Sequence, residues 1–252
     1  LEFPVTPQSL ESTIAVERQA VAEIAEAVAR HGHDIAAIII EPIQGEGGDN
    51  HFRPEFLKKL RALADEHEFL LIFDEVQTGF GTTGKWWSFE HFDVEPDVFA
   101  FAKKTQVCGI AGGPRLDEVD SVFKISSRIN STWGGNLVDM VRCQRIVEII
   151  EEDGLLDNAT RVGAHLLAGF AELERLFPGK VTSRRGRGFF IAFDLPDSET
   201  RNRTLRALNE SDVLGLASGE RAIRMRPPLV LSQSEADEGL RRIERALATV
   251  LA

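Results

Sequence analysis

Cysteine is scarce in this 252-residue sequence, and a long apolar run is missing altogether. Cys108 and Cys143 lie far apart and outside any metal-ligand spacing, so we expect neither a disulfide framework nor a metal site. A reducing cytoplasm is the natural setting for such a chain. No apolar run approaches the roughly 20 residues of a membrane helix. We recognise no signal peptide, and because the first residue is Leu1, we expect the chain to be cut from a longer one.

Basic residues are also in deficit. The sequence has 29 Lys and Arg against 40 Asp and Glu, which gives a formal net charge of −11. A surface this acidic repels nucleic acid and anionic membranes, so we expect neither as a partner. Hydrophobic residues are 43% and charged residues 27% of the chain, the balance of an ordinary globular protein.

The first half alternates short apolar runs with stretches of helical periodicity. The runs end in charged residues, at Glu41, at Asp74 and at Lys103. This alternation predicts an α/β fold with a parallel sheet covered on both faces, and ligands bind at the carboxyl edge of such sheets. The helices are expected at 12–31 and from 54 onward, and the strands at 35–40, 69–73 and 98–102.

The second half predicts a smaller α+β domain. A long helical stretch runs over 137–152, breaks at Gly154 and resumes to 176. Ser232 and Glu235 form a capping-box pattern before the last helix. We therefore divide the chain into 1–155 and 156–252. Because three strands cannot complete a covered sheet, we expect the remaining strands to precede Leu1. The later strands are expected at 189–195 and 222–225, with a short helix between them.

Asp74 and the Lys103-Lys104 pair are unremarkable when taken singly. An Asp after a strand is usually a turn carboxylate, and paired lysines usually lie on the surface. Together, a carboxylate and a lysine at neighbouring strand ends are what a pyridoxal phosphate site requires. The lysine amine forms a Schiff base with the aldehyde, and the carboxylate keeps the pyridine nitrogen protonated.

Five ordered motifs span most of the chain: EPIQGEGG at 41–48, DEVQTGFGTTG at 74–84, PDVFAFAK at 96–103, STWGGN at 131–136 and IRMRPPL at 223–229. Together these motifs resemble the class III (ornithine-type) aminotransferases. The resemblance implies the fold type I of pyridoxal-phosphate-dependent transferases. This chain would hold part of the large parallel-sheet domain and the small C-terminal α+β domain.

The resemblance assigns four residues to the cofactor. Asp74 matches the aspartate that pairs with the pyridine nitrogen, and Val76 matches the residue packed against the ring face. Gln77 matches the residue near the phenolic oxygen, which also meets substrate. Thr132 matches the threonine that reaches the cofactor phosphate from the partner subunit, so the resemblance implies a homodimer with a shared site.

The resemblance also assigns the catalytic lysine and a gating pair. The Schiff-base lysine of the family lies six positions after the aspartate matched by Asp97, which selects Lys103. Periodicity alone cannot choose between Lys103 and Lys104, because the strand before them is apolar on both faces. Glu46 and Arg224 match a pair in which the glutamate holds the arginine until a second carboxylate arrives.

Finer matches resemble the family members that act on L-lysine. The implied activity is transfer of the 6-amino group of L-lysine to 2-oxoglutarate, which gives an aldehyde that cyclises. A class III enzyme for ornithine, acetylornithine or a diamine stays open, as does a non-catalytic fragment of the fold. The matching segments are GGDNHFRPEF at 47–56, KKTQVCG at 103–109 and SRINSTWGGN at 127–136.

Three family features precede these motifs in the family and are missing from this sequence. They are the phosphate-cradling glycine loop, the aromatic residue stacked on the cofactor and the arginine for the substrate α-carboxylate. The glycine-containing segment 186–188 is no substitute for the loop, because it precedes a predicted strand and not a helix. We therefore expect the chain to hold about half a site.

Overall fold

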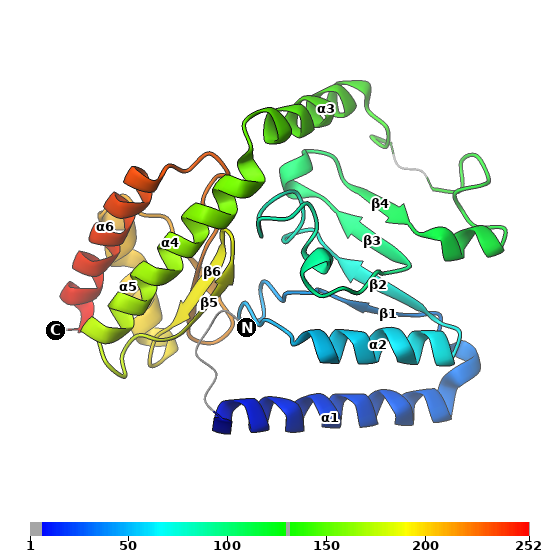
Figure 1. Cartoon of the computed structure of the whole chain (residues 1–252), viewed down its shortest axis with the longest axis horizontal. Coiled ribbons are helices and arrows are strands. Elements are labelled where there is room, and N and C mark those ends of the chain that lie inside the picture. Colours follow the sequence, from blue (N-terminus) through cyan, green and yellow to red (C-terminus); the bar gives the residue numbers. More distant parts are fainter. Residues whose placement is uncertain (1–6, 130–131, 252) are drawn as a thin grey trace.

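The computed structural model describes residues 7–129 and 132–251, which form two four-stranded sheets flanked by helices (Figure 1). The first sheet has the order β1-β2-β3-β4. Strands β1, β2 and β3 are parallel, as the alternating pattern predicted. Its strands are β1 (Ala37–Ile40), β2 (Leu70–Asp74), β3 (Val98–Phe101) and β4 (Gly109–Gly112).

The sequence analysis missed strand β4, so the prediction of three strands was wrong. Strand β4 pairs with β3 in the antiparallel direction. It is glycine-bounded and lacks the apolar run that marks the other three strands. The connection from β3 is too short for the crossover that a parallel strand needs, and it holds only the 3₁₀ turn η3 (Lys103–Thr105).

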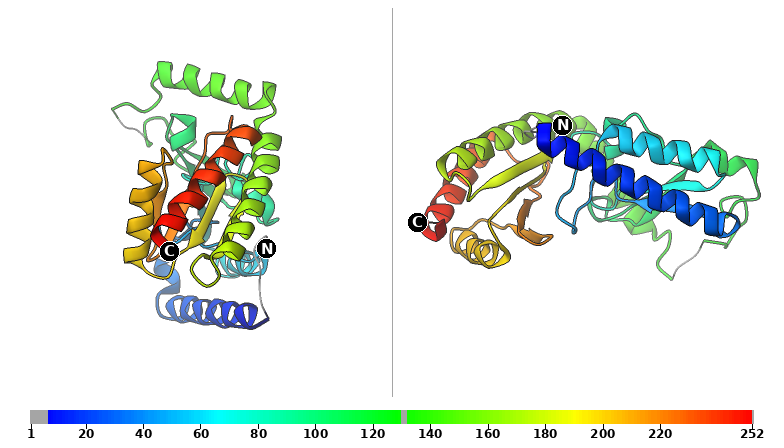
Figure 2. Two further views of the ribbon diagram at one scale, coloured as in Figure 1. Left: turned by 90° about the vertical axis from the view of Figure 1, so that its left-hand side faces the viewer. Right: turned by 90° about the horizontal axis from the view of Figure 1, so that it is seen from below.

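Two helices lie along one face of this sheet. Helix α2 (Pro54–Glu66) begins with a proline in its first turn and buries the predicted apolar face, Phe56, Leu57, Leu60 and Leu63, in the core beneath β1 and β2. Helix α1 (Pro7–His31) begins before the predicted residue 12 and runs alongside α2 (Figure 2). The opposite face is less covered than predicted, since Ile39 of β1 is 67% exposed.

The second sheet is antiparallel, with the order β5-β6-β8-β7, and its core is formed with helices α4, α5 and α6. The sequence analysis missed β5 and β7, because β5 contains three arginines and no apolar alternation, and β7 has only three residues. The elements are α4 (Leu155–Leu176), β5 (Thr182–Arg187), β6 (Phe190–Asp194), α5 (Ser198–Glu210), β7 (Leu216–Ser218), β8 (Ala222–Met225) and α6 (Gln233–Leu251).

The start of the last helix and the end of helix α3 lie where the local sequence signals predicted them. Ser232 and Glu235 form the expected capping box, since the Glu235 carboxylate accepts the Ser232 N–H at 2.8 Å and the Ser232 hydroxyl accepts the Glu235 N–H at 3.3 Å. Helix α3 (Leu137–Glu152) ends before Gly154, whose φ of +60° is a left-handed conformation that favours glycine. The remaining short elements are 3₁₀ turns η1 (Gly32–Asp34), η2 (Ser88–His91) and η4 (Pro114–Glu118).

Along the chain, the strands of the first sheet precede the α3–α4 break and those of the second sheet follow it, and the division at residue 155 stays a prediction. They also share a joint, because Phe190 of β6 is fully buried in the core of the first sheet. Most residues predicted to carry chemistry lie at this joint or at the strand ends that face it.

Candidate functional site

The structure places Asp74 and Lys103 at the same edge of the first sheet. Asp74 is the last residue of β2 and is in register with Ala100 of β3. Its carboxylate Oδ1 accepts the Val76 N–H at 2.9 Å, which fixes the carboxylate and leaves its second oxygen available. Lys103 begins the turn that follows β3 directly. Asp74 and Lys103 therefore lie at neighbouring strand ends.

The two adjacent lysines have different surroundings. Lys103 is exposed and has a φ of +58°. This left-handed conformation ends the extended backbone of the preceding strand. Lys104 is half-buried, and its burial, with Arg226 and Lys103 nearby, lowers its pKa to about 8. The two lysines therefore have different environments, and the assignment of Lys103 as the Schiff-base lysine stays a prediction.

Glu46, Gln77 and Arg224 come together from three distant segments. The Arg224 guanidinium forms a short ion pair with the Glu46 carboxylate and donates to Gln77 Oε1 at 3.2 Å. The Arg224 side chain is 8% exposed, whereas the Glu46 side chain is 73% exposed. A buried cation is therefore matched by a carboxylate that is free to move into solvent, which is the arrangement a gate needs.

Glu75 is a site-supporting carboxylate that the sequence analysis passed over. It is buried, and it accepts from the Ser88 hydroxyl and from the Phe89 N–H, each at 2.9 Å, and from the Thr78 hydroxyl. Burial raises its pKa, against the effect of these hydrogen bonds. Glu75 thus ties the turn that carries Val76 and Gln77 to the η2 segment.

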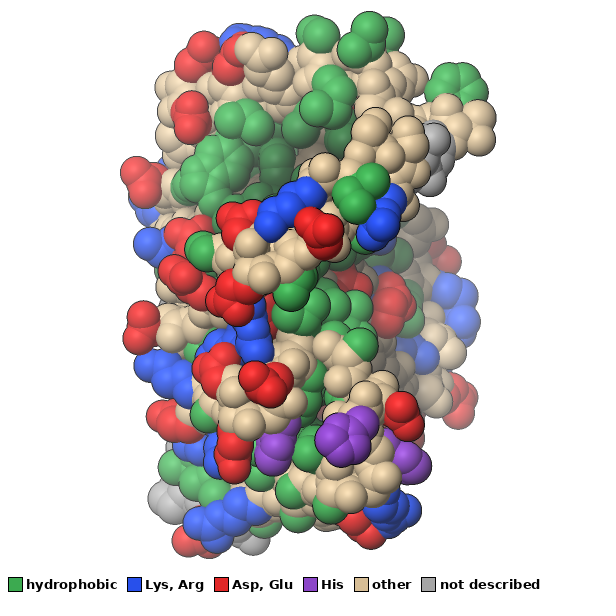
Figure 3. All heavy atoms as spheres, turned by 90° about the vertical axis from the view of Figure 1, so that its right-hand side faces the viewer, with side chains coloured by type: hydrophobic (Ala, Val, Ile, Leu, Met, Phe, Trp, Pro, Cys, Tyr) green, Lys and Arg blue, Asp and Glu red, His purple; other side chains and the backbone are tan. Residues whose placement is uncertain are grey.

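Thr132 lies on an exposed turn before α3, and the structure does not bring it to the Arg224 cluster. Its neighbour Ser131 lies outside the described residues. Figure 3 looks onto this side of the molecule and shows hydrophobic side chains gathered over its upper part. The exposed apolar residues of this region are Ile110, Val119, Val122, Phe123, Ile125, Ile129, Trp133, Leu137, Val138, Met140 and Val141.

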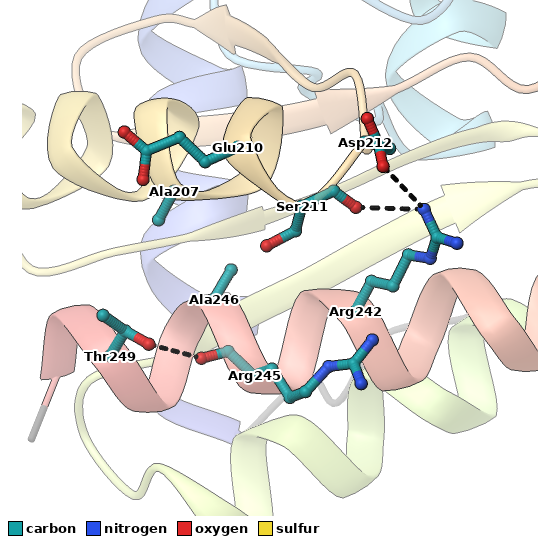
Figure 4. A pocket seen from close by; sticks show the side chains of 8 residues that line it. All are labelled: Ala207, Glu210, Ser211, Asp212, Arg242, Arg245, Ala246 and Thr249. Atoms are coloured by element: carbon teal, nitrogen blue, oxygen red, sulfur yellow. Dashed lines mark hydrogen bonds and ion pairs between the residues drawn. The ribbon is translucent and has the colours of Figure 1, made fainter.

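A hollow of about 500 Å³ between α5 and α6 is separate from these residues (Figure 4). Part of its charged rim is paired within the hollow, since Arg242 donates to the Ser211 carbonyl at 3.2 Å and lies 3.5 Å from the Asp212 carboxylate. None of the predicted site residues lines it. Within residues 7–129 and 132–251, no helix is long and apolar enough to span a bilayer.

Comparison with known proteins now identifies the family. The profile described as Aminotransferase class-III matches residues 1–247, and the chain belongs to this family. This match and the solved structures below confirm the resemblance and the fold class predicted from the sequence.

Several of the similar proteins share one name. L-lysine-epsilon aminotransferase from Mycobacterium tuberculosis (strain ATCC 25618 / H37Rv) is 49% identical over 94% of this chain and 53% of the relative. The protein of that name from Amycolatopsis lactamdurans is 47% identical over 99% of this chain and 56% of the relative. The solved lysine aminotransferase from M. tuberculosis in the internal aldimine form has a TM-score of 0.93 and 46% identity, over 99% of this chain and 58% of that chain. The chain therefore spans about half the length of these relatives.

Proposed function

We propose that this chain forms part of a pyridoxal-phosphate-dependent aminotransferase that transfers the 6-amino group of L-lysine to 2-oxoglutarate. The observation that carries the proposal is the buried Arg224 guanidinium held by the exposed Glu46 carboxylate. An enzyme that accepts lysine at its far amine and 2-oxoglutarate beside a carboxylate needs an arginine that can be covered and uncovered. The shared name of the relatives at 47–49% identity supports lysine as the donor.

The residues at the strand ends fit pyridoxal phosphate. Lys103 supplies an exposed primary amine for the aldehyde, and Asp74 supplies a half-buried carboxylate with one oxygen uncommitted. Val76 would lie against the ring face, Gln77 near the phenolic oxygen and Thr132 of a partner subunit at the phosphate. When bound, pyridoxal phosphate supplies an electron sink for the charge that develops on the substrate carbon.

The chain's own groups then have distinct tasks. The Asp74 carboxylate would hold a proton on the ring nitrogen, and the Lys103 Nζ would move the proton at the reacting carbon of the substrate. Gln77 and Glu46 hold Arg224 while lysine reacts. The α-carboxylate of 2-oxoglutarate then takes the Arg224 fork in a bidentate contact, and Glu46 turns toward solvent.

We further propose a homodimer that shares the site and works in the cytoplasm. Large exposed apolar patches mark interaction surfaces, and the exposed apolar residues near Thr132 in the sequence support a second subunit on this side of the molecule. Cys108 and Cys143 are free thiols, which suits a reducing compartment.

Another class III substrate is the second candidate, because acetylornithine aminotransferase from Agrobacterium fabrum is 38% identical over 87% of this chain. The test uses the completed enzyme, meaning this chain joined to the N-terminal half of the M. tuberculosis relative. L-lysine, ornithine, acetylornithine and a diamine are compared as donors to 2-oxoglutarate. We expect the highest kcat/KM for L-lysine, with glutamate as product and no activity after Lys103→Ala. A higher value for any other donor would reject lysine as the substrate.

A further inference from the structure

At the joint, two neighbouring ion pairs connect the loop after β1 to strand β8 and the residue that follows it. Glu46 and Asp49 stand three residues apart on the loop after β1, and Arg224 and Arg226 stand two residues apart on and after β8. Because side chains alternate along a strand, both guanidiniums lie on the same face. Glu46 pairs with Arg224, and Asp49 pairs with Arg226.

The two pairs differ in what can move. The Glu46 side chain is 73% exposed, whereas the Asp49 side chain is 0% exposed. The Arg226 guanidinium also lies over the Phe190 ring, 3.3 Å from its centroid, so it is packed as well as paired. The Asp49 carboxylate is therefore fully enclosed, whereas the Glu46 carboxylate of the other pair faces solvent.

Hydrogen bonds from the second sheet also hold the backbone of the loop that carries Glu46 and Asp49. The Ser218 hydroxyl donates to the Gly45 carbonyl at 2.7 Å, and the Gly219 N–H donates to the Glu46 carbonyl at 2.8 Å. The Arg185 guanidinium donates to the Asp49 carbonyl at 3.0 Å. These contacts hold the loop backbone against the second sheet, so the Glu46 side chain can move while its backbone stays in place.

We propose that Asp49 and Arg226 form a positioning pair, which holds the loop and strand in register so that the Glu46 carboxylate returns to Arg224 after each dicarboxylate leaves. This inference rests on the proposed function, in which Glu46 and Arg224 act as the gate. Asp49 and Arg226 touch neither substrate nor cofactor in this scheme, and they act through the gating pair.

The charges around Arg226 explain how the Asp49–Arg226 pair affects the Glu46–Arg224 pair. Burial lowers the pKa of Arg226, Asp49 opposes that effect, and Arg224 and Glu46 are close enough to contribute. Without the Asp49 charge, the Arg226 cation lacks its buried partner and competes with Arg224 for the mobile Glu46 carboxylate. Removing Asp49 should therefore uncover Arg224, although Asp49 does not contact it.

The first test measures that uncovering without cofactor or substrate. The 252-residue chain is treated with phenylglyoxal, and the rate of modification at Arg224 is followed by peptide mass spectrometry. Glu46→Gln should raise this rate about tenfold, the scale of a lost charge-assisted hydrogen bond. Asp49→Asn should raise it about threefold or more, and Asp49→Glu should restore part of the protection. The double variant should not exceed Glu46→Gln, because both changes remove the same contact.

A matched control separates positioning from general loosening. Glu174 and Arg184 form a similar partly buried ion pair between α4 and β5, on the helix-covered side of the same sheet. Glu174→Gln should leave the Arg224 rate unchanged. An Asp49→Asn rate equal to that of the unaltered chain, or effects of Glu46→Gln and Asp49→Asn that multiply, would overturn the proposal. If Asp49→Asn does not fold by circular dichroism, Asp49→Ser serves in its place, with the same increase expected, because it also removes the buried charge.

The second test uses the completed enzyme and separates this inference from the proposed function. Asp49→Asn should slow the lysine half-reaction and strengthen 2-oxoglutarate binding, in the same sense as Glu46→Gln but by less. An enzyme that never reacts with lysine would reject the proposed function and leave the modification result standing. Normal half-reactions in Asp49→Asn, with lysine activity present, would reject the positioning role itself.

Discussion

The proposed gating role of the Glu46–Arg224 pair is tested most directly by a substitution of Glu46. Glu46→Gln keeps the size of the side chain and removes its charge. The Arg224 guanidinium, 8% exposed, would then meet only neutral acceptors, Gln77 Oε1 at 3.2 Å and the amide oxygen of the substituted side chain. A buried cation without a counter-charge is costly, so any ligand that brings a carboxylate to it should bind more tightly.

The magnitude follows from the unequal burial of the pair. Exposed ion pairs contribute about 0–1 kcal/mol, and breaking a fully buried pair costs about 3–5 kcal/mol. With Arg224 buried and Glu46 73% exposed, we take about 1–2 kcal/mol, which is about 5- to 30-fold in affinity. Glu46→Gln should strengthen 2-oxoglutarate binding and slow the lysine half-reaction by factors in this range. Arg224→Ala should have the reverse effect and impair the 2-oxoglutarate half-reaction more than the lysine one.

Single-turnover measurements on the completed enzyme provide the assay, because steady-state rates mix the two half-reactions. Glu172→Gln is the control, since it removes an exposed glutamate that also pairs with an arginine, Arg175, on α4. The control should leave both half-reactions unchanged. If Glu46→Gln and Arg224→Ala slowed both half-reactions equally, the gate would be refuted and the pair would be structural.

Three further predictions concern the strand ends. Lys103→Ala should abolish the visible absorption band of bound cofactor in the completed enzyme and Lys104→Ala should leave it, and the opposite result would reverse their assignment. Asp74→Asn should lower turnover at least ~10²-fold, the scale of a lost preorganised electrostatic partner, and near-normal turnover would exclude Asp74 as the ring partner. Because burial lowers the pKa of Lys104 from 10.5 to about 8, the unfolded chain binds more protons between these pH values, and the free energy of unfolding should rise with pH there. Lys104→Met should flatten that rise in urea denaturation of the 252-residue chain, and an unchanged slope would show that Lys104 titrates normally.

The sequence by itself determined the parts that depend on neighbouring residues. Apolar runs followed by charged residues located β1, β2 and β3 and the edge at which Asp74 and Lys103 lie. Helix α2 and the cap of α6 were also predictable, because a first-turn proline and a capping box are local signals. The ordered motifs predicted the family, which the profile match confirms. The roles assigned to individual residues stay predictions until they are tested.

Only the tertiary structure decided what depends on residues far apart in the chain. Strands β4, β5 and β7 have no apolar signature of their own and form because β3, β6 and β8 offer unpaired edges. The environments of Lys103 and Lys104 depend on a turn conformation and on Arg226, neither of which strand periodicity encodes. Asp49 and Arg226 stand 177 positions apart, and each has other charged residues close by in sequence. The packing of the two sheets at their joint decides which carboxylate pairs with which guanidinium. An ion pair depends on the distance between two groups in space, which their separation along the chain does not give.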